Sequence, residues 1–334
     1  MNRYFATFVA GTKEIVSEIL RREYKDISFE EVFDNLLVFK TDKQITPFTS
    51  LPYLNNVFLV INKFGSPEMQ DFTKLTEWCL SKNTFINQFY TYADKYNFHQ
   101  YKIQFFVDRI SVSRQDDLSK LKEAIDIKHS SGFSDFEVWF LKRTEGVSFV
   151  GIRLTKKPDY QELLPKGEIR HELSYILGYL SELKSTDKVL DPFSGHGSIP
   201  LTICKHFKVL SVIASDKEIG NIKTAMSNER VKYSNLSIER IDGYSLEGIK
   251  DESIDKILTD PPWGASTEVE NLKMKYEQML NSFYRVLKPN GILILLTSQG
   301  ELVDSLIKKV NFKLFHKYQV NVGGRGSYVY KLRK

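Results

Sequence analysis

The chain has 334 residues, which is more than one average domain and enough for two or three. Its hydrophobic content of 42% and charged content of 27% are ordinary for a globular protein with a sizeable core. The net charge of +5 is compatible with a polyanionic partner but does not identify one. Cys79 and Cys204 form no C-x-x-C pair, which argues against a disulfide framework and against structural zinc.

Targeting and membrane signals are not apparent in the sequence. Residues 1–10 show no basic region followed by an apolar core, so a signal peptide is not indicated. The longest apolar run, Gly291–Thr297, has the length of a strand rather than of a membrane span. We expect a soluble cytoplasmic protein that uses neither a membrane nor a metal.

The first half of the chain predicts a mixed α/β region without a motif that carries chemistry. Strands at Phe5–Ala10 and Leu36–Lys40 are expected around a helix at Lys13–Tyr24. Further elements are expected at Asn56–Lys63, Leu75–Lys82, Tyr101–Val107, Leu118–Ile127, Phe136–Leu141 and Val147–Leu154. The polar stretch Lys156–Gly167, with two prolines, then predicts a linker.

The second half predicts strands that alternate with helices. Apolar spacing first indicates a helix within Glu168–Leu183. The expected strands are Lys188–Leu190, Val209–Ala214, Leu236–Arg240, Ile254–Thr259 and Ile292–Thr297. The helices between and after them are expected at Ser198–Lys205, Glu218–Lys232, Met274–Leu287 and Glu301–Val310. Two last strands, Phe312–Val320 and Ser327–Leu332, have no helix between them, so we expect a doubly wound parallel sheet with an antiparallel pair at one edge.

The first candidate site is the run Asp191-Pro192-Phe193-Ser194-Gly195-His196-Gly197, between a strand and a helix. Glycines let backbone amides approach a ligand closely. The acid that ends the strand makes this run more specific than an isolated Gly-x-Gly pair. We interpret Asp191 and the Gly195–Gly197 backbone as contacts to the amino-acid end and ribose of S-adenosylmethionine. No Gly-Lys-Ser/Thr follows, which excludes a triphosphate-binding P-loop.

Two further acids follow the next strands. Asp216 lies 19 residues after Gly197, close to the spacing at which an acid accepts hydrogen bonds from ribose hydroxyls. A helix N-cap is the alternative role for Asp216. Asp242 follows the third strand and can accept from an adenine amino group, although an Asx turn explains it almost as well.

The run Asp260-Pro261-Pro262-Trp263 follows the strand Ile254–Thr259, at the strand end where α/β sheets bind ligands. Two prolines remove amide donors and restrict the backbone, which leaves the Pro261 carbonyl available to a ligand. Asp260 and that carbonyl can then accept both hydrogens of an exocyclic amine. Trp263 offers a face on which a base can stack. A rigid loop with a buried tryptophan is the competing interpretation.

These motifs resemble those of Rossmann-like amino-methyltransferases. The resemblance covers Glu168–Lys334, with Asp191–Gly197 similar to the first cofactor motif and Asp260–Trp263 similar to the catalytic [D/N]-P-P-[Y/F/W] motif. It implies the class I methyltransferase fold, S-adenosylmethionine as cofactor, and Asp260, Pro261 and Trp263 as catalytic residues. The implied cofactor contacts are Asp191, Phe193, Gly195, Gly197, Asp216 and Asp242. Family members usually have Thr or Ala where this chain has His196.

The first half resembles the THUMP-containing RNA methyltransferases. Leu51–Phe64 is similar to their RSAxRV helix region and Gly151–Leu154 to their closing strand. The resemblance implies an N-terminal ferredoxin-like subdomain (1–47), a THUMP-like RNA-binding domain (48–155), a linker (156–168) and a methyltransferase domain (169–334). Basic residues of the first half are candidates for phosphate contacts, although such charges are commonly only solvated. They are Arg109, Arg114, Lys142, Arg143 and Arg153.

The residue at position 260 bears on the target base. An ionised Asp only accepts hydrogen bonds, whereas Asn accepts and donates. Guanine presents N1–H beside its amino group, while adenine and cytosine present a ring acceptor there. Asp260 therefore favours guanine N2. In architecture and length the chain resembles the tRNA guanine-N2 methyltransferases of the acceptor stem, and this resemblance implies tRNA as the substrate.

Three alternatives stay open. An adenine-N6 methyltransferase of RNA or DNA is the first, although no dedicated sequence-reading domain is apparent. A protein glutamine methyltransferase is the second, and Asp260 argues against it because those enzymes carry the Asn form of the motif. A catalytically inactive RNA-binding or scaffold protein is the third, and the intact acidic residues argue against it.

Overall fold

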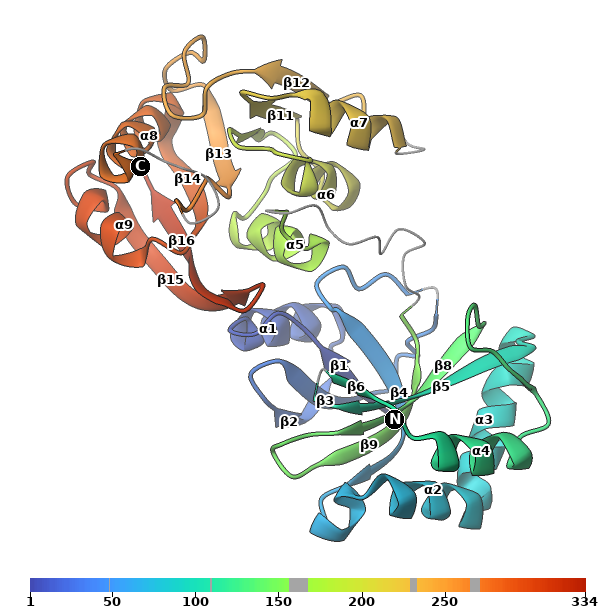
Figure 1. The fold of residues 1–334 in the computed structure, drawn as a ribbon. Helices are drawn as coiled ribbons and strands as arrows, with labels where there is room; N and C mark the ends of the chain where they lie inside the picture. Colours follow the sequence, from blue (N-terminus) through green and yellow to red (C-terminus); the bar gives the residue numbers. More distant parts are fainter. Residues whose placement is uncertain (48, 109, 156–167, 229–232, 265–270) are drawn as a thin grey trace. The chain divides into compact units, whose positions relative to one another are not determined.

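The computed structural model describes residues 1–47, 49–108, 110–155, 168–228, 233–264 and 271–334. The chain divides into two compact units, one of residues 1–7 and 17–160 and the other of residues 8–16 and 161–334. Each unit is built on its own sheet (Figure 1). Helix α1 (Lys13–Glu23) begins in the segment grouped with the second unit and ends in the first. The predicted linker lies largely outside the described residues, and the predicted domain bounds stay predictions.

Among the described residues, nine strands form the sheet of the first unit, in the order β2-β3-β1-β4-β9-β8-β5-β6, with β7 paired to β5. The strands are β1 (Asn2–Thr7), β2 (Ser28–Val32), β3 (Leu36–Thr41), β4 (Asn56–Phe64), β5 (Gln100–Val107), β6 (Ile110–Val112), β7 (Lys128–His129), β8 (Phe136–Lys142) and β9 (Ser148–Arg153). Strand β5 runs parallel to β7 and β8, and the other pairs are antiparallel. The segment that resembles a helix region, Leu51–Phe64, contains β4, which pairs with β1 and β9.

The helices of this unit are α2 (Phe72–Ser81), α3 (Asn83–Tyr96) and α4 (Gln115–Ala124), with a short 3₁₀ turn at Pro67–Gln70. Helix α3 is absent from the sequence prediction because Asn, Thr and aromatic residues form helices poorly by themselves. Its Phe89 ring packs against Tyr101 of β5 at 5.0 Å and Phe136 of β8 at 5.1 Å. This helix therefore depends on aromatic packing against the sheet rather than on local propensity.

In the part of the second unit that the structure describes, seven strands form a sheet in the order β12-β11-β10-β13-β14-β16-β15. The strands are β10 (Lys188–Asp191), β11 (Ser211–Asp216), β12 (Leu236–Arg240), β13 (Ile254–Thr259), β14 (Leu287–Thr297), β15 (Lys313–Val322) and β16 (Arg325–Arg333). The pairs among β12, β11, β10, β13 and β14 are parallel, and β16 is antiparallel to both β14 and β15. This topology confirms the predicted parallel sheet with an antiparallel pair at its edge.

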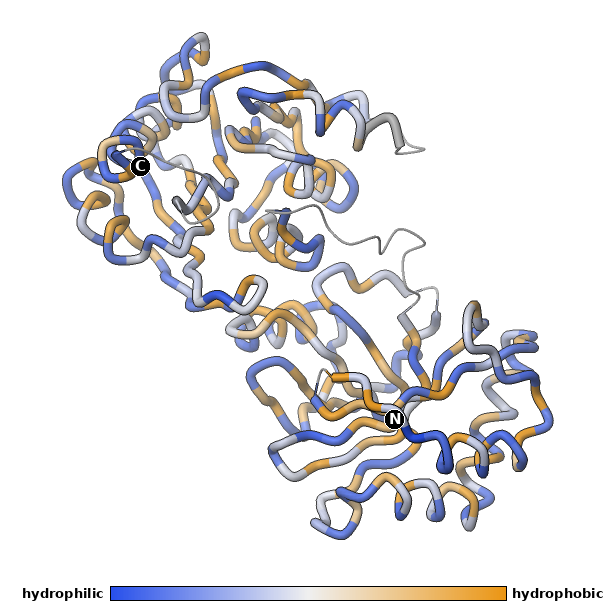
Figure 2. Tube along the Cα trace, viewed as in Figure 1, coloured by the Kyte–Doolittle hydropathy of each residue, from blue (hydrophilic) through white to orange (hydrophobic). Residues whose placement is uncertain are grey.

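The helices of the second unit are α5 (His171–Leu180), α6 (Ser198–His206), α7 (Gly220–Asn228), α8 (Leu272–Val286) and α9 (Gly300–Ile307). Helices α8 and α9 pack on the sheet through a core that includes Phe283, Leu293 and Leu306, all fully buried. The apolar residues of α5 and α6 stand out in orange in Figure 2. Helix α5 lies against α6 at Gly178, where an added Cβ would meet the Ile203 and Phe207 side chains at 2.7 Å.

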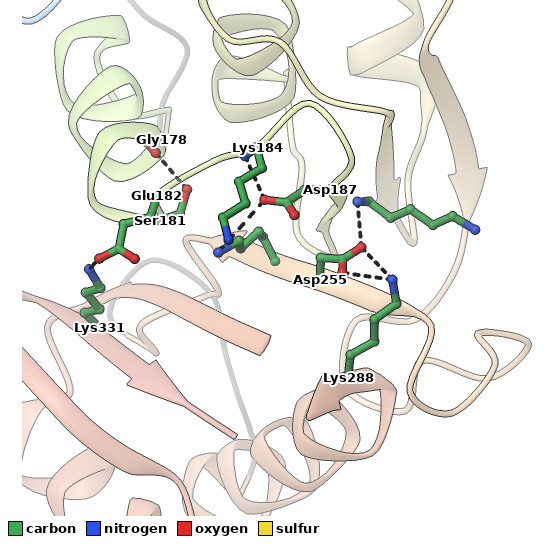
Figure 3. A network of polar contacts seen from close by, with 10 residues as sticks. Gly178, Ser181, Glu182, Lys184, Asp187, Asp255, Lys288 and Lys331 are labelled. Carbon is green, nitrogen blue, oxygen red and sulfur yellow. Dashed lines mark hydrogen bonds and ion pairs between the residues drawn. The ribbon is translucent and has the colours of Figure 1, made fainter. Parts of the chain in front are cut away.

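Paired charges lie at the end of the sheet where the parallel strands begin, away from the end where ligands bind in such sheets (Figure 3). The pairs are Asp255–Lys288 at 2.8 Å, Glu182–Lys331, and Asp187–Lys256 at 3.9 Å. Asp255 also accepts a hydrogen bond from the Lys188 amide at 2.9 Å. The acids of this network therefore each have a lysine partner.

Replacement of Gly178 by valine should destabilise the second unit, because the new side chain would enter the contact between α5 and α6. Overpacking of this kind typically costs about 1–3 kcal/mol. Gly220→Ala is the matched control, since a Cβ there would meet nothing within 4 Å, and it should change stability by less than about 1 kcal/mol. Urea unfolding followed by circular dichroism measures both, and equal stability of the two variants would contradict the packing argument.

Candidate active site

The candidate site is built from loops that follow adjacent parallel strands. Asp191 ends β10 and Asp216 ends β11, while Asp260 directly follows β13. Strand β10 pairs with both β11 and β13, so these three strand ends are neighbours at one edge of the sheet. Strand order reverses beside β10, and ligands of doubly wound sheets bind at such a switch point.

The loop after β10 has the backbone conformation that its glycines permit. Gly195 and Gly197 have φ of 52° and 93°, which an ordinary side chain rarely adopts. The Gly195 N–H donates to Asp216 Oδ2 at 3.0 Å. The other oxygen of Asp216 accepts from the Glu218 N–H at 3.0 Å. Asp216 thus joins the loop after β10 to the start of the loop after β11, and its carboxylate keeps lone pairs for a further donor.

Glu168 belongs to the site although the sequence analysis assigned it only to a helix. Its carboxylate accepts hydrogen bonds from the His196 N–H at 3.1 Å and from the Ser198 N–H at 3.0 Å. His196 Nδ1 also lies 3.2 Å from Glu168 Oε2. The carboxylate therefore serves the unpaired amides at the start of α6, where a negative charge is favoured. No sequence signal identifies Glu168, because it acts on residues that lie about thirty positions away.

Asp191 is almost completely buried, with 1% of its surface exposed. Loss of solvation raises its pKa from 3.8 to about 8, and the nearby Glu168 and Asp216 charges add to the increase, while the Phe193 N–H lowers it. The pKa of Asp260 is also raised well above its ordinary value, first by loss of solvation and then by Asp191 and Glu168. A bound cation would relieve both effects.

A hydrogen bond between the first and last side chains of the Asp260–Trp263 loop spans the loop. The Trp263 indole N–H donates to Asp260 Oδ1 at 2.7 Å, which lowers the pKa of Asp260 against the effect of burial. The second carboxylate oxygen has no such bond to the indole. Among the residues that the structure describes, none donates a hydrogen bond to the Pro261 carbonyl. One carboxylate oxygen and one carbonyl of the loop are thus available as acceptors.

Asp242 lies in the loop after β12, which packs against the loop after β10. Asp242 is exposed and accepts from the Tyr244 N–H at 3.0 Å, which is the Asx turn weighed for it. A Cβ on Gly243 would stand 2.5 Å from the Pro192 carbonyl and 2.6 Å from the Phe193 ring. The Phe193 and Tyr244 rings meet edge to face at 5.1 Å. The two loops therefore touch through backbone that only glycine permits.

The candidate RNA-binding residues belong to the first unit, and two of them are buried. Arg143 bonds to Glu145 at 2.8 Å, and Arg153 lies 3.1 Å from Glu137. Either would have to leave its carboxylate to meet a phosphate, so a phosphate role is less favourable there than at an exposed position. Arg114 is partly exposed but contacts Asp117 and Thr73. Lys142 lies over the Phe72 ring at 5.0 Å, Arg109 lies outside the described residues, and the phosphate role of all five stays a prediction.

Within the described ranges, no group of three or more His, Cys, Asp or Glu side chains is placed to hold a metal ion. Over the same residues, none of the helices has both the length and the apolar character that crossing a membrane requires.

A model of the UPF0020 family, described as the RMKL-like methyltransferase domain, matches residues 158–327. The tRNA (guanine(10)-N2)-dimethyltransferase of Methanothermobacter thermautotrophicus is 26% identical over 169 residues, which are 50% of this chain and 49% of that protein. The tRNA (guanine(6)-N2)-methyltransferase of Thermus thermophilus is 28% identical over 195 residues, 56% of this chain and 57% of that protein. The chain spans about half the length of these relatives.

The crystal structure of TrmN from Thermus thermophilus has a similar fold over 100% of both chains, with a TM-score of 0.78 and 21% sequence identity. This likeness confirms the predicted α/β fold.

Asp191→Asn should stabilise the ligand-free chain, and increasingly so as the pH rises from about 4 to 8. The pKa of Asp191 is raised in the folded state, so ionisation of this group favours the unfolded chain. The gain in the free energy of unfolding should be near zero at pH 4 and on the order of a few kcal/mol at pH 8. Urea unfolding at several pH values measures it. Asp251→Asn, at a side chain 68% exposed, is the control, and an equal gain in both variants, or a gain for Asp191→Asn that is independent of pH, would contradict the assignment.

Proposed function

Since this chain belongs to the UPF0020 family of RMKL-like methyltransferase domains, we propose that it transfers a methyl group from S-adenosylmethionine to guanine N2 in tRNA. The observation that carries the proposal is the pair of acceptors at Asp260 and Pro261, at the end of β13 beside the buried Asp191. Two acceptors suit the two hydrogens of an exocyclic amine. The acidic edge of the sheet suits a cationic cofactor.

The residues present fit S-adenosylmethionine. Asp191 and Asp260 are both carboxylates whose pKa values burial raises, and a positively charged ligand lowers such pKa values again. Gly195 and His196 of the glycine loop are only partly buried at the same strand ends. When bound, the cofactor supplies an electrophilic methyl group on a sulfonium sulfur. The roles of Asp191, the glycine loop and Asp216 are to hold its amino-acid end and ribose, and that of Asp242 is to accept from its adenine.

Asp260 and the Pro261 carbonyl hold the amine so that its lone pair is directed away from conjugation with the ring. The Trp263 N–H keeps one oxygen of Asp260 fixed, so that the other oxygen is the acceptor for the substrate. An ionised Asp260 accepts from both N1–H and the amino group of guanine, whereas adenine would place a lone pair against it. After transfer the nitrogen loses a proton easily, so the site needs no dedicated base.

The substrate class rests on the relatives, whose names specify tRNA and guanine N2 but differ in position and in the number of methyl groups. A base within a helix must be swung out of its stack, which costs a few kcal/mol, so a folded tRNA with an accessible guanine is the expected form. The cytoplasm is the expected location of such an activity.

Incubation of the full chain with tritiated S-adenosylmethionine and separate pools of tRNA, rRNA and DNA tests the proposal directly. Digestion of the labelled pool to nucleosides should give N2-methylguanosine from tRNA. The Asp260→Ala variant is the control and should lose label by more than about 100-fold, because it removes the acceptor of the amine. Label in N6-methyladenosine would contradict the base assignment, and label only in protein would contradict the RNA substrate.

Trp263→Phe should move the pH dependence of methylation to higher pH. The substitution keeps an aromatic face but removes the indole N–H that lowers the pKa of Asp260. Because the ionised carboxylate is the active form, activity at pH 7 should fall more than activity at pH 9. Initial rates at saturating cofactor from pH 6 to 9.5 measure this. A rate that falls by the same factor at every pH would show that the indole N–H does not act through Asp260.

A further inference from the structure

Three residues outside the predicted site form a hydrogen-bonded group that reaches the Asp260–Trp263 loop. They are Tyr276 on α8, Thr297 at the end of β14, and Gln299 just before α9. Each comes from a different element, and all three reach the loop or one another by hydrogen bonds. None belongs to the sequence motif that defines the loop.

The hydrogen bonds form a chain that starts at the Gln299 backbone N–H and ends at the Pro262 carbonyl. The Gln299 N–H donates to Thr297 Oγ1 at 3.0 Å, so the Thr297 hydroxyl keeps its own proton to donate. Thr297 Oγ1 lies 3.0 Å from the Tyr276 hydroxyl, which in turn donates to the Pro262 carbonyl at 3.2 Å. Tyr276 has one proton, so its bond to Pro262 requires that Thr297 be the donor between these two hydroxyls. Bonds in such a chain strengthen one another.

Gln299 also acts on the loop directly. Its side-chain Nε2 donates to the Trp263 carbonyl at 2.6 Å. One residue therefore starts the chain that ends on Pro262 and also binds the next carbonyl along the loop. The consecutive carbonyls of Pro262 and Trp263 are therefore both held by donors from outside the loop.

The burial of these groups indicates that the arrangement is specific. Tyr276 and Thr297 are 0% exposed, and a hydroxyl buried without a partner is costly. Phenylalanine and valine would fill the same space without that requirement. Pro261 and Pro262 have no backbone N–H, so they can accept hydrogen bonds but cannot donate them. The donors that hold the carbonyls of this loop therefore come from other parts of the chain.

We infer that Tyr276, Thr297 and Gln299 are positioning residues that set the orientation of the Pro261–Trp263 backbone, and thereby the acceptor pair presented to the target amine. The inference rests on the proposed methylation. With Pro262 and Trp263 held by their carbonyls, the Pro261 carbonyl is left for the substrate. Misplacement of an acceptor by about 1 Å is enough to lower a rate by up to about 100-fold.

The first test compares Tyr276→Phe and Thr297→Val with Tyr284→Phe. Tyr284 lies on the same helix and its ring packs on Phe312, with no hydrogen bond from its hydroxyl to the residues that the structure describes. The two site variants should lower kcat by about 10-fold or more while the Kd for S-adenosylmethionine changes less than about 2-fold. The control should keep both values. An unchanged kcat in both site variants, or an equal loss in Tyr284→Phe, would overturn the inference.

Gln299→Glu gives a readout that a merely structural role would not move. An ionised Glu cannot donate to the Trp263 carbonyl, whereas a protonated Glu can. The ratio of variant to wild-type kcat should therefore rise as the pH falls from 8 to 5.5. A ratio that does not change with pH would overturn the role assigned to this side chain.

Fluorescence separates this inference from the proposed function. In a Trp78→Phe/Trp139→Phe background, Trp263 is the remaining tryptophan. Tyr276→Phe and Gln299→Glu should make it more accessible to acrylamide at pH 8, and Tyr284→Phe should not. This response in a protein that methylates no RNA would support the positioning role while contradicting the proposed function. Unchanged quenching in both variants would overturn the positioning role whether or not the protein is active.

Discussion

The site depends on one electrostatic constraint: several carboxylates meet at the end of a parallel sheet without metal or lysine partners among the described residues. Glu168 and Asp216 are stabilised by backbone amides of the glycine loop, and Asp260 by the Trp263 indole. Asp191 is buried with its charge largely uncompensated, which is why its pKa is raised. The glycine conformations and the start of α6 bring the amides of Gly195, His196 and Ser198 to these oxygens. The negative charge that these donors do not neutralise favours a cationic ligand.

The two ends of the sheet in the second unit differ in whether their acidic side chains are paired with lysines. At the end where the parallel strands begin, the acids of the network in Figure 3 are paired with lysines, and the pairs tie the segment after α5 to β13 and β16 and tie β13 to β14. At the carboxyl ends, the acids contact neutral donors instead. A stable scaffold favours paired charges, whereas a binding site for a cation needs charges left available. This contrast is consistent with the candidate site at the carboxyl ends of the parallel strands and does not depend on any motif.

The Asp260–Trp263 loop depends on hydrogen-bond donors from other elements. Its two prolines restrict the backbone but supply no donors, so buried hydroxyls and an amide from α8, β14 and α9 provide them. Polar groups of the second unit thus hold the carbonyls of this loop in addition to stabilising the fold. In the first unit, by contrast, the buried Arg143 and Arg153 form ion pairs with Glu145 and Glu137.

Local sequence alone determined the strand–helix alternation of the second half, the antiparallel pair at its edge, and the placement of Asp191, Asp216 and Asp260 at strand ends. These features follow from hydrophobic periodicity and from residues a few positions apart, which a linear pattern contains. Tertiary structure decided the rest. Helix α3 forms through aromatic contacts with β5 and β8, Glu168 acts on amides about thirty residues away, and Tyr276, Thr297 and Gln299 act across three elements. Whether a basic residue is exposed or paired likewise depends on carboxylates distant in sequence, as the pairs Arg143–Asp108 and Arg153–Glu137 show. Such contacts join residues that no local pattern relates, so only the folded chain reveals them.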